Sequence, residues 1–209
     1  MRFFNDLAKI EKTQNHLPHW QQEGSTYFVT WRLKDSIPRD VLERLINEKS
    51  NWERSHHKPW TDIEEAEYHN TFSKESDRLM DMEFGECVLR HLNCRDALAN
   101  SLSLFDGERF LMHSWVAMPN HVHVLFSLVE GGSLEKVIGG WKGYSSKDIN
   151  VVMGNEGSLW QKDYFDRIIR YWEHMFRAAK YIRRNPEKAK LRDGEFTLYE
   201  AEWVKQMLG

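Results

Sequence analysis

Long apolar runs, a leader segment and cysteines are missing or scarce in this chain of 209 residues. No apolar run reaches the roughly 18 residues that a membrane span needs, so no membrane partner is expected. The first residues, from Met1 to Asp6, lack the apolar core of a signal peptide. The two cysteines, Cys87 and Cys94, cannot form a disulfide framework or a four-ligand zinc site on their own. These absences predict a soluble, cytoplasmic protein.

A charge excess of one sign is also missing, since 29 Lys and Arg against 32 Asp and Glu give a net charge of −3. On its own, this balance argues against nucleic acid as a partner. The balance combines two blocks, because residues 39–86 hold 7 basic and 13 acidic residues, whereas residues 161–192 hold 10 basic and 4 acidic residues. A local basic stripe is typical of phosphate binding even on a slightly acidic chain. A solvated helix face is the alternative explanation, and composition does not choose between them.

The size and composition of the chain fit one folded domain. An apolar content of 41% is enough to close a core. No internal repeat, low-complexity tract or linker requires a second domain. We therefore interpret residues 1–209 as a single domain, with an N-terminal arm over 1–25, a helical insertion over 39–84 and a C-terminal extension over 192–209.

Aromatic and β-branched runs, apolar periodicity and turn residues predict the order of the elements. Ser133 should cap a short helix that Gly139 and Gly140 interrupt, residues 150–160 should form a loop, and Pro186 should end the last helix. Strands are expected near 27–33, 110–117, 121–128 and 164–169, and helices near 39–54, 61–80, 84–104 and 171–184.

The order of these elements predicts the fold class. Without the two acidic helices over 39–84, it matches the split βαβ pattern of a ferredoxin-like sheet. The predicted fold is therefore α+β: a ferredoxin-like βαββαβ antiparallel sheet, one further C-terminal helix, and an acidic helical pair inserted after the first strand.

The first residues with evident chemistry are His121 and His123, separated by Val122. Side chains alternate along a strand, so both imidazoles point to one face and can share a metal ion. The next residue on that face is Leu125, so a third ligand has to come from another element. Two histidines on a half-exposed strand, making ordinary hydrogen bonds, are the alternative.

The helix near 171–184 offers a group that could complete such a site. An apolar stripe should face the core, formed by Trp172, Met175, Phe176, Ala179 and Ile182. Tyr181 should lie opposite Trp172, with Arg177 and Asn185 close to it on that side. A phenol, an amide oxygen and an arginine together suit an active site, although each also suits an ordinary helix surface.

Two motifs together resemble a known family. Residues 118–125 read Met-Pro-Asn-His-Val-His-Val-Leu, and residues 181–186 read Tyr-Ile-Arg-Arg-Asn-Pro. This combination resembles the REP-associated tyrosine transposases of the single-tyrosine HUH (His-hydrophobic-His) nuclease superfamily. Further similar stretches are 18–20, 27–33, 159–161 and 165–170, so the resemblance spans roughly 16–191. The acidic insertion departs from compact relatives and has no predicted role.

The resemblance implies a mechanism and assigns residues to it. His121 and His123 would bind Mg²⁺ or Mn²⁺ with Asn185 as the third ligand, and Tyr181 would be the nucleophile of a catalytic helix. The protein would be a transposase-like endonuclease and strand transferase that forms a 5′-phosphotyrosine. Its substrate would be single-stranded DNA beside a hairpin. Tyr144 is a rival phenol, ranked second because it lies in a glycine-flanked stretch without a ligand four residues later.

The resemblance and the basic segment together also predict DNA contacts. Trp160, like Trp141, could stack on unpaired bases, with core packing as the alternative for both. Phosphate contacts are expected from the cationic side chains of Lys142, Lys162, Arg167, Arg170, Arg177, Arg183 and Arg184.

Two other functions remain open at this point. A catalytically silent module that binds DNA or RNA hairpins would use the same surface, and a metal-dependent phosphodiesterase could use water instead of Tyr181. The sequence leaves a monomer and a homodimer equally open, because the helix that carries Tyr181 could complete its own site or that of a partner.

Overall fold

The computed structural model describes residues 3–4, 11–14, 18–56 and 61–209. Its centre is one sheet of five strands, β3 (Thr26–Arg32), β4 (Phe110–Ala117), β5 (His121–Leu128), β6 (Phe165–Ile168) and β7 (Thr197–Glu200). The spatial order is β6-β3-β5-β4-β7, and every neighbouring pair is antiparallel. The four strands predicted from the sequence thus lie in the order fourth, first, third, second, as in a ferredoxin-like sheet. The predicted α+β class is confirmed.

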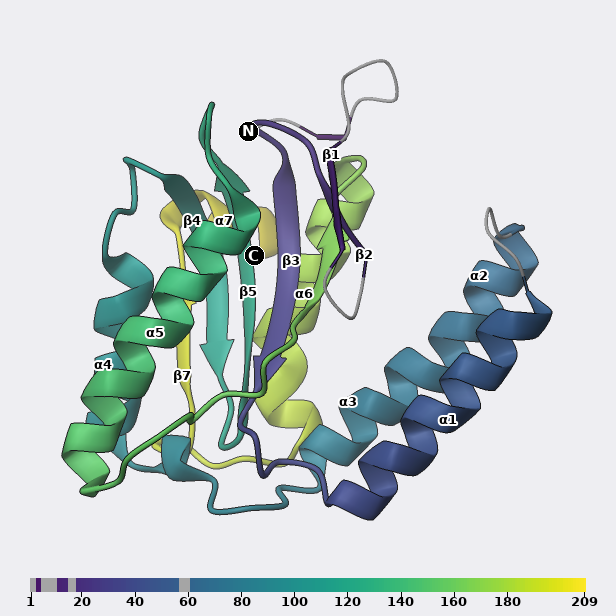
Figure 1. The fold of residues 1–209 in the computed structure, drawn as a ribbon. Helices are drawn as coiled ribbons and strands as arrows, with labels where there is room; N and C mark the ends of the chain where they lie inside the picture. The colour runs from purple at the N-terminus through teal and green to yellow at the C-terminus, as the bar shows by residue number, and fades with distance from the viewer. Residues whose placement is uncertain (1–2, 5–10, 15–17, 57–60) are drawn as a thin grey trace.

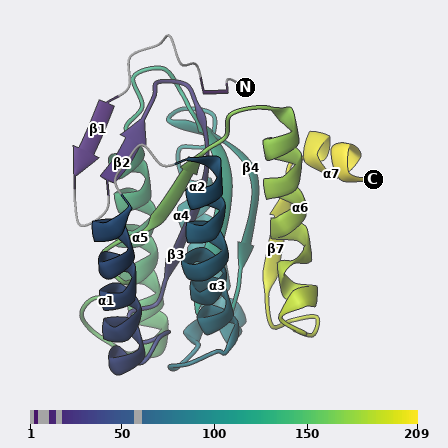
Figure 2. The same ribbon diagram turned by 90° about the vertical axis from the view of Figure 1, so that its right-hand side faces the viewer.

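Helices cover both faces of this sheet (Figures 1 and 2). On one face, α4 (Leu92–Ser103) and α5 (Leu134–Met153) pack on the inward side chains of the central strands, among them Val122, Val124 and Phe126. On the other face, α6 (Trp172–Lys188) and α7 (Glu202–Leu208) pack on Val116 and Leu125. The two-residue alternation of β5 thus divides its side chains between two cores.

The acidic insertion forms a helical hairpin that projects from the sheet (Figure 1). It consists of α1 (Arg39–Ser55), α2 (Asp62–Tyr68), a π-helical turn (His69–Ser73) and α3 (Lys74–Asp81). A small core of Ile37, Leu79 and Met80 packs α1 and α3 together at the base of this hairpin. The helices predicted near 39–54 and 61–80 are confirmed.

Three helix predictions were wrong, and tertiary packing explains each. The helix α5 runs through Gly139 and Gly140, because its buried stripe outweighs the roughly 1 kcal/mol that each glycine costs. The helix α6 includes Pro186 in its last turn, where only one helical hydrogen bond is lost. The helix predicted from residue 84 begins at Leu92, because Cys87 has a left-handed backbone with φ 49°.

The two ends of the chain add smaller elements. The N-terminal arm contains a two-stranded antiparallel sheet of β1 (Glu11–Gln14) and β2 (Pro18–Gln21). A 3₁₀ turn (Val88–Arg90) precedes α4. The C-terminal extension supplies β7 at the sheet edge and α7 in the second core. Within the part of the chain that the structure describes, no helix combines the length and apolar character needed to cross a bilayer.

Candidate active site

The two histidines of β5 lie side by side on the sheet face that α6 covers. His123 is opposite Thr30 of β3 and Val116 of β4, while His121 is opposite Arg32. The ring centroids of His121 and His123 are 4.8 Å apart. Each residue is only 1% exposed. The predicted alternation therefore brings two imidazoles together in the interior beneath α6.

A hydrogen bond to Asn120 determines which ring nitrogen of His121 carries the proton. The Asn120 amide group donates from Nδ2 to the backbone carbonyls of Met80 and Phe84, at 3.1 and 3.4 Å. Its Oδ1 lies 2.8 Å from His121 Nδ1 and can only accept. His121 Nδ1 therefore carries the proton, and Nε2 keeps the lone pair that a metal ion requires.

His123 and Asn185 meet on the inner side of α6. His123 Nδ1 lies 2.7 Å from the hydroxyl of Thr30, and its Nε2 lies 3.4 Å from Asn185 Nδ2. Asn185 is 1% exposed, and its Oδ1 has no hydrogen-bond partner among the described residues. An unpaired buried oxygen costs about 1–3 kcal/mol, which a bound cation would offset.

The donor set of His121, His123 and Asn185 fits a divalent cation. Burial lowers the pKa of His121 to about 3 and holds the pKa of His123 well below its ordinary value, so both rings are neutral. Neutral imidazole is the form that binds metal. In the described ranges, no cluster of three or more His, Cys, Asp or Glu side chains suits a metal ion, so a metal site at the histidine pair would need the Asn185 amide as its third ligand.

Tyr181 lies next to these groups and is hydrogen-bonded to the insertion. Its hydroxyl donates to Asp77 Oδ2 at 2.9 Å, across 104 positions of sequence. Its ring meets His123 edge-on at a centroid distance of 5.1 Å, and Phe28 in the same way at 5.7 Å. Burial raises the pKa of Tyr181 well above its ordinary value, and the Asp77 carboxylate raises it further. The phenol is therefore neutral and needs help to become a nucleophile.

The face of α6 that packs on the sheet differs from the predicted stripe. Trp172 is 48% exposed, whereas Ala178 and Asn185 are buried with the rest of the inner face. The buried side is therefore rotated toward Asn185. Tyr181 lies at the edge of this side rather than opposite it, which is why its ring contacts His123 instead of solvent.

Two cations lie near the phenol. Lys188 Nζ is 6.0 Å from the centroid of the Tyr181 ring and 3.0 Å from a carboxylate oxygen of Asp81. Burial raises the pKa of Asp77 above its ordinary range, while the positive charges of Lys188 and Arg167 oppose that rise. Arg177, four residues before Tyr181 on α6, donates to the hydroxyl of Tyr171 at 3.0 Å.

The rival phenol and the predicted stacking tryptophans lie elsewhere. Tyr144 belongs to α5, which covers the opposite face of the sheet, and it is 51% exposed. The sheet therefore separates Tyr144 from the histidine pair. Trp160 and Trp141 are only 4% and 2% exposed, and the Trp160 indole donates to Ser145 Oγ at 3.0 Å. Both tryptophans belong to the core. Core packing is therefore the correct explanation for them, and the prediction that they stack on bases was wrong.

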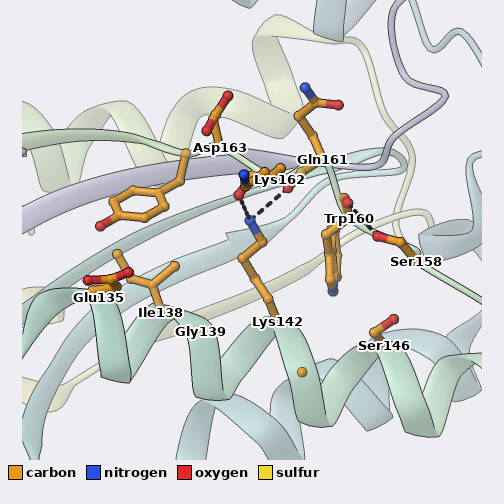
Figure 3. A pocket seen from close by; sticks show the side chains of 12 residues that line it. Glu135, Ile138, Gly139, Lys142, Ser146, Ser158, Trp160, Gln161, Lys162 and Asp163 are labelled. Atoms are coloured by element: carbon orange, nitrogen blue, oxygen red, sulfur yellow. Dashed lines mark hydrogen bonds between the residues drawn. The ribbon is translucent and has the colours of Figure 1, made fainter. Parts of the chain in front are cut away.

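Lys142 lines a cavity on the α5 side of the molecule (Figure 3). The cavity has a volume of about 640 Å³ and lies between α5 and the segment over residues 158–164. The Lys142 ammonium donates to the backbone carbonyls of Gln161 and Lys162, at 2.7 Å each. Burial lowers the pKa of Lys142 to about 8. This side chain helps to hold the segment on α5, whereas Lys162 itself is exposed.

The predicted arginines fall into two groups. Arg183 forms a two-pronged ion pair with Glu200 of β7, at 2.8 and 3.0 Å, and so connects α6 to the sheet edge. Arg170, Arg177 and Arg184 are exposed. Arg184 forms a surface ion pair with Glu187, in which Nε lies 3.6 Å from Oε2. These exposed side chains can meet phosphates, whereas Arg183 is already paired.

Sequence reasoning missed several residues of this site. Asn120 precedes the first histidine, and Lys188 follows Tyr181 by seven residues, which is two helical turns on one face. Those two positions could have been found from spacing. Asp77 offers no such clue, because it is one of 12 acids in the insertion and meets Tyr181 only in the folded chain.

The fold and this site define an α+β protein whose phenol-bearing helix closes over a pair of strand histidines. Comparison with known families adds the relationship. Residues 97–185 match the family model described as "Transposase IS200 like", and this segment contains the histidine pair, Tyr181 and Asn185. Over these residues the chain is similar to IS200-like transposases, and the predicted resemblance to tyrosine transposases is confirmed.

Solved structures with a similar chain path were also found. A REP-associated tyrosine transposase bound to a REP hairpin is 16% identical, covers 84% of this chain and 74% of its own, and has a TM-score of 0.45. A protein of Deinococcus radiodurans R1 described as a transposase is 13% identical, covers 88% of this chain and 98% of its own, and has a TM-score of 0.35. No curated protein matches this chain.

Proposed function

We propose that this transposase-like protein cuts and rejoins single strands of DNA beside a hairpin, through a covalent bond between Tyr181 and a 5′-phosphate. The observation that supports this most is one juxtaposition: the Tyr181 ring lies against His123, whose Nε2 lies 3.4 Å from Asn185 of the same helix. A nucleophile and a set of metal ligands thus adjoin each other, as phosphoryl transfer to a side chain requires.

His121, His123 and Asn185 would hold Mg²⁺ or Mn²⁺, because nitrogen donors mixed with an amide oxygen suit these ions. When bound, the cation supplies Lewis-acid polarisation of the scissile phosphate. Asn120 and Thr30 bond the two imidazoles through Nδ1, which leaves both Nε2 atoms available to a cation, and His123 Nε2 already lies 3.4 Å from Asn185 Nδ2.

The Tyr181 oxygen would attack phosphorus and form a new O–P bond while the bond from phosphorus to O3′ breaks. The products are a 5′-phosphotyrosine and a free 3′-hydroxyl, so the bond energy is retained and rejoining needs no ATP. The positive charge of Lys188, 6.0 Å from the ring, favours the negative charge that builds on phosphorus. One tyrosine allows one covalent bond at a time, which suits the cutting of single strands.

A DNA partner is supported by the surface around α6. Residues 161–192 hold 10 basic and 4 acidic residues, and Lys162, Arg170, Arg177 and Arg184 are exposed there. Such side chains neutralise phosphates whatever the base sequence. The REP-associated transposase noted above was solved with a REP hairpin. We extend that substrate class to this chain as part of the proposal.

The test uses a labelled single strand next to a hairpin, incubated with the protein and Mn²⁺ and run on a denaturing gel. A covalent adduct should form, and it should vanish in Tyr181→Phe. Tyr144→Phe is the matched control, because it removes an exposed phenol from the opposite side of the sheet. Cleavage that survives Tyr181→Phe would indicate hydrolysis by water. Tight binding without any cleavage would indicate a silent hairpin-binding module.

A further inference from the structure

The acidic insertion contributes a carboxylate to the atoms that react. Asp77 Oδ2 of α3 accepts the hydroxyl hydrogen of Tyr181 at 2.9 Å. This distance is within the range for a general base and the proton that it removes. The insertion therefore reaches the nucleophile itself, rather than only packing beside the domain.

The contact is held from both sides. Asp77 lies one turn before Met80 and Asp81 on α3, so all three meet the same region of the domain. The backbone carbonyl of Met80 accepts from Asn120, which also orients His121. Asp81 pairs with Lys188 of α6 at 3.0 Å. These contacts fix α3 between the histidine strand and the tyrosine helix.

The neighbouring groups cannot take the proton of Tyr181. The Nδ1 proton of His121 is donated to Asn120, and the remaining lone pairs of His121 and His123 are committed to the cation in the proposed function. Asn185 carries an amide, which is not a base. Asp77 is thus the basic side chain that the described structure places in a hydrogen bond with the phenol. Burial raises its pKa, which improves it as a proton acceptor.

We propose that Asp77 is a catalytic residue, which removes the hydroxyl proton of Tyr181 as the phenol attacks the scissile phosphate. The proton passes to the Asp77 carboxylate while the O–P bond forms. The bond from phosphorus to O3′ breaks with its electron pair on O3′, which takes a proton from water. In rejoining, the 3′-hydroxyl attacks phosphorus and gives its proton to water, and the tyrosine oxygen recovers its proton from Asp77.

This inference rests on the proposed function and gives the insertion a role. Once protonated, Asp77 is neutral and no longer repels the phosphate bound to Tyr181. The positive charges of Lys188 and Arg167 favour the ionised carboxylate before the reaction, against the rise in pKa that burial causes. The acidic helical pair, unexplained by sequence, would thus carry the base to an active site formed by the transposase domain.

The experiment measures the rate of adduct formation in single turnovers with Mn²⁺. Asp77→Asn keeps the shape and can still accept the hydrogen bond, but it cannot take the proton. We expect its rate to fall by about 100-fold or more, the usual contribution of a general base. Glu75→Gln is the matched control, because it makes the same charge change at an exposed position of the same helix. Its rate should stay within about three-fold of the unmodified protein.

A second arm separates proton removal from simple positioning. Replacing Tyr181 by 3,5-difluorotyrosine makes the phenol more acidic, so it needs a base less. In Asp77→Asn, this replacement should raise the rate of adduct formation by at least about ten-fold. With Asp77 present, it should change that rate little. Equal responses in both backgrounds would assign Asp77 a structural role and overturn the proposal.

A third arm needs no metal and no DNA. With 3-fluorotyrosine at position 181, the ¹⁹F resonance should shift in Asp77→Asn and stay unchanged in Glu75→Gln. An unchanged resonance in both would mean that the contact is absent in solution. An Asp77→Asn protein that forms adduct as fast as the unmodified protein, or faster, refutes the inference while leaving the proposed function intact. Failure of the unmodified protein to form any adduct refutes the proposed function, and this inference with it.

Discussion

Asn120 provides the sharpest test of how the site is assembled, since its side chain joins three parts of the chain. The residue is fully buried and makes three hydrogen bonds, to the carbonyls of Met80 and Phe84 and to His121 Nδ1. Asn120→Ala removes all three bonds and leaves two buried carbonyl acceptors and one ring donor without this partner. At about 1 kcal/mol for each bond, the free energy of unfolding should fall by about 3 kcal/mol.

The loss can be measured by urea unfolding followed through tryptophan fluorescence, because the chain has nine tryptophans and several are buried. For a chain of this size, about 3 kcal/mol corresponds to a fall in Tm of roughly 6–12 °C. Mn²⁺ affinity should also fall, by about 10- to 100-fold, because His121 loses the partner that fixes its proton. Asn155→Ala, at an exposed position, is the control and should change neither quantity.

Hydrogen exchange adds a local measurement to the same variant. The amides of α3 should exchange faster in Asn120→Ala, because the Asn120 side chain bonds the last turn of that helix and the carbonyl of Phe84 just beyond its end. A loss of stability below about 0.5 kcal/mol, together with unchanged exchange in α3 and unchanged Mn²⁺ affinity, would refute the reasoning. The hydrogen bonds of Asn120 would then have no part in assembling the site.

Three further predictions concern other regions of the chain. His121→Ala should abolish cleavage with Mn²⁺ while leaving most DNA binding in a filter assay, and normal cutting would show that the metal assignment is wrong. Trp160→Ala should lower the free energy of unfolding by about 3–5 kcal/mol, since the ring is in the core, and a stable variant with weakened DNA binding would contradict this. Burial lowers the pKa of His113 to about 4, so the folded state disfavours its charged form. The free energy of unfolding that this neutral ring contributes should be present above about pH 6.5 and be lost as the pH falls toward 4. In urea titrations, His113→Gln should therefore lose less stability than the unmodified protein over this pH range. The same dependence of stability on pH in both proteins would contradict this prediction.

The strands could be predicted because their evidence is local. The strands β4 and β5 run over the predicted residues, since alternating apolar side chains and the Pro119-Asn120 turn define a hairpin without reference to the rest of the chain. The helix errors had the opposite origin. Gly139 and Pro186 are unfavourable locally, but both lie in helices whose buried faces supply more free energy than these residues cost.

The same division applies to the site. The alternation of β5 places His121 and His123 on one face, and the four-residue spacing places Asn185 beside Tyr181, so these groups follow from periodicity. The rotation of α6 about its axis does not follow from periodicity, because either the face with Trp172 or the face with Ala178 could pack on the sheet. Only tertiary packing decides that Ala178 is buried and Trp172 exposed. The predicted stacking role of Trp160 failed for a similar reason, because tertiary packing buries its ring and its indole donates to Ser145.

The sequence by itself determined the order of the strands along the chain, the shared face of His121 and His123, and the adjacency of Tyr181 and Asn185, because these depend on repeats of two and 3.6 residues within single elements. The tertiary structure alone decided that the acidic insertion meets the tyrosine. Asp77 and Tyr181 are 104 positions apart, and their contact exists because the Asn120 side chain bonds the last turn of α3 and Lys188 of α6 pairs with Asp81. A contact of that kind depends on how separate elements dock, and no local pattern in the chain encodes the docking.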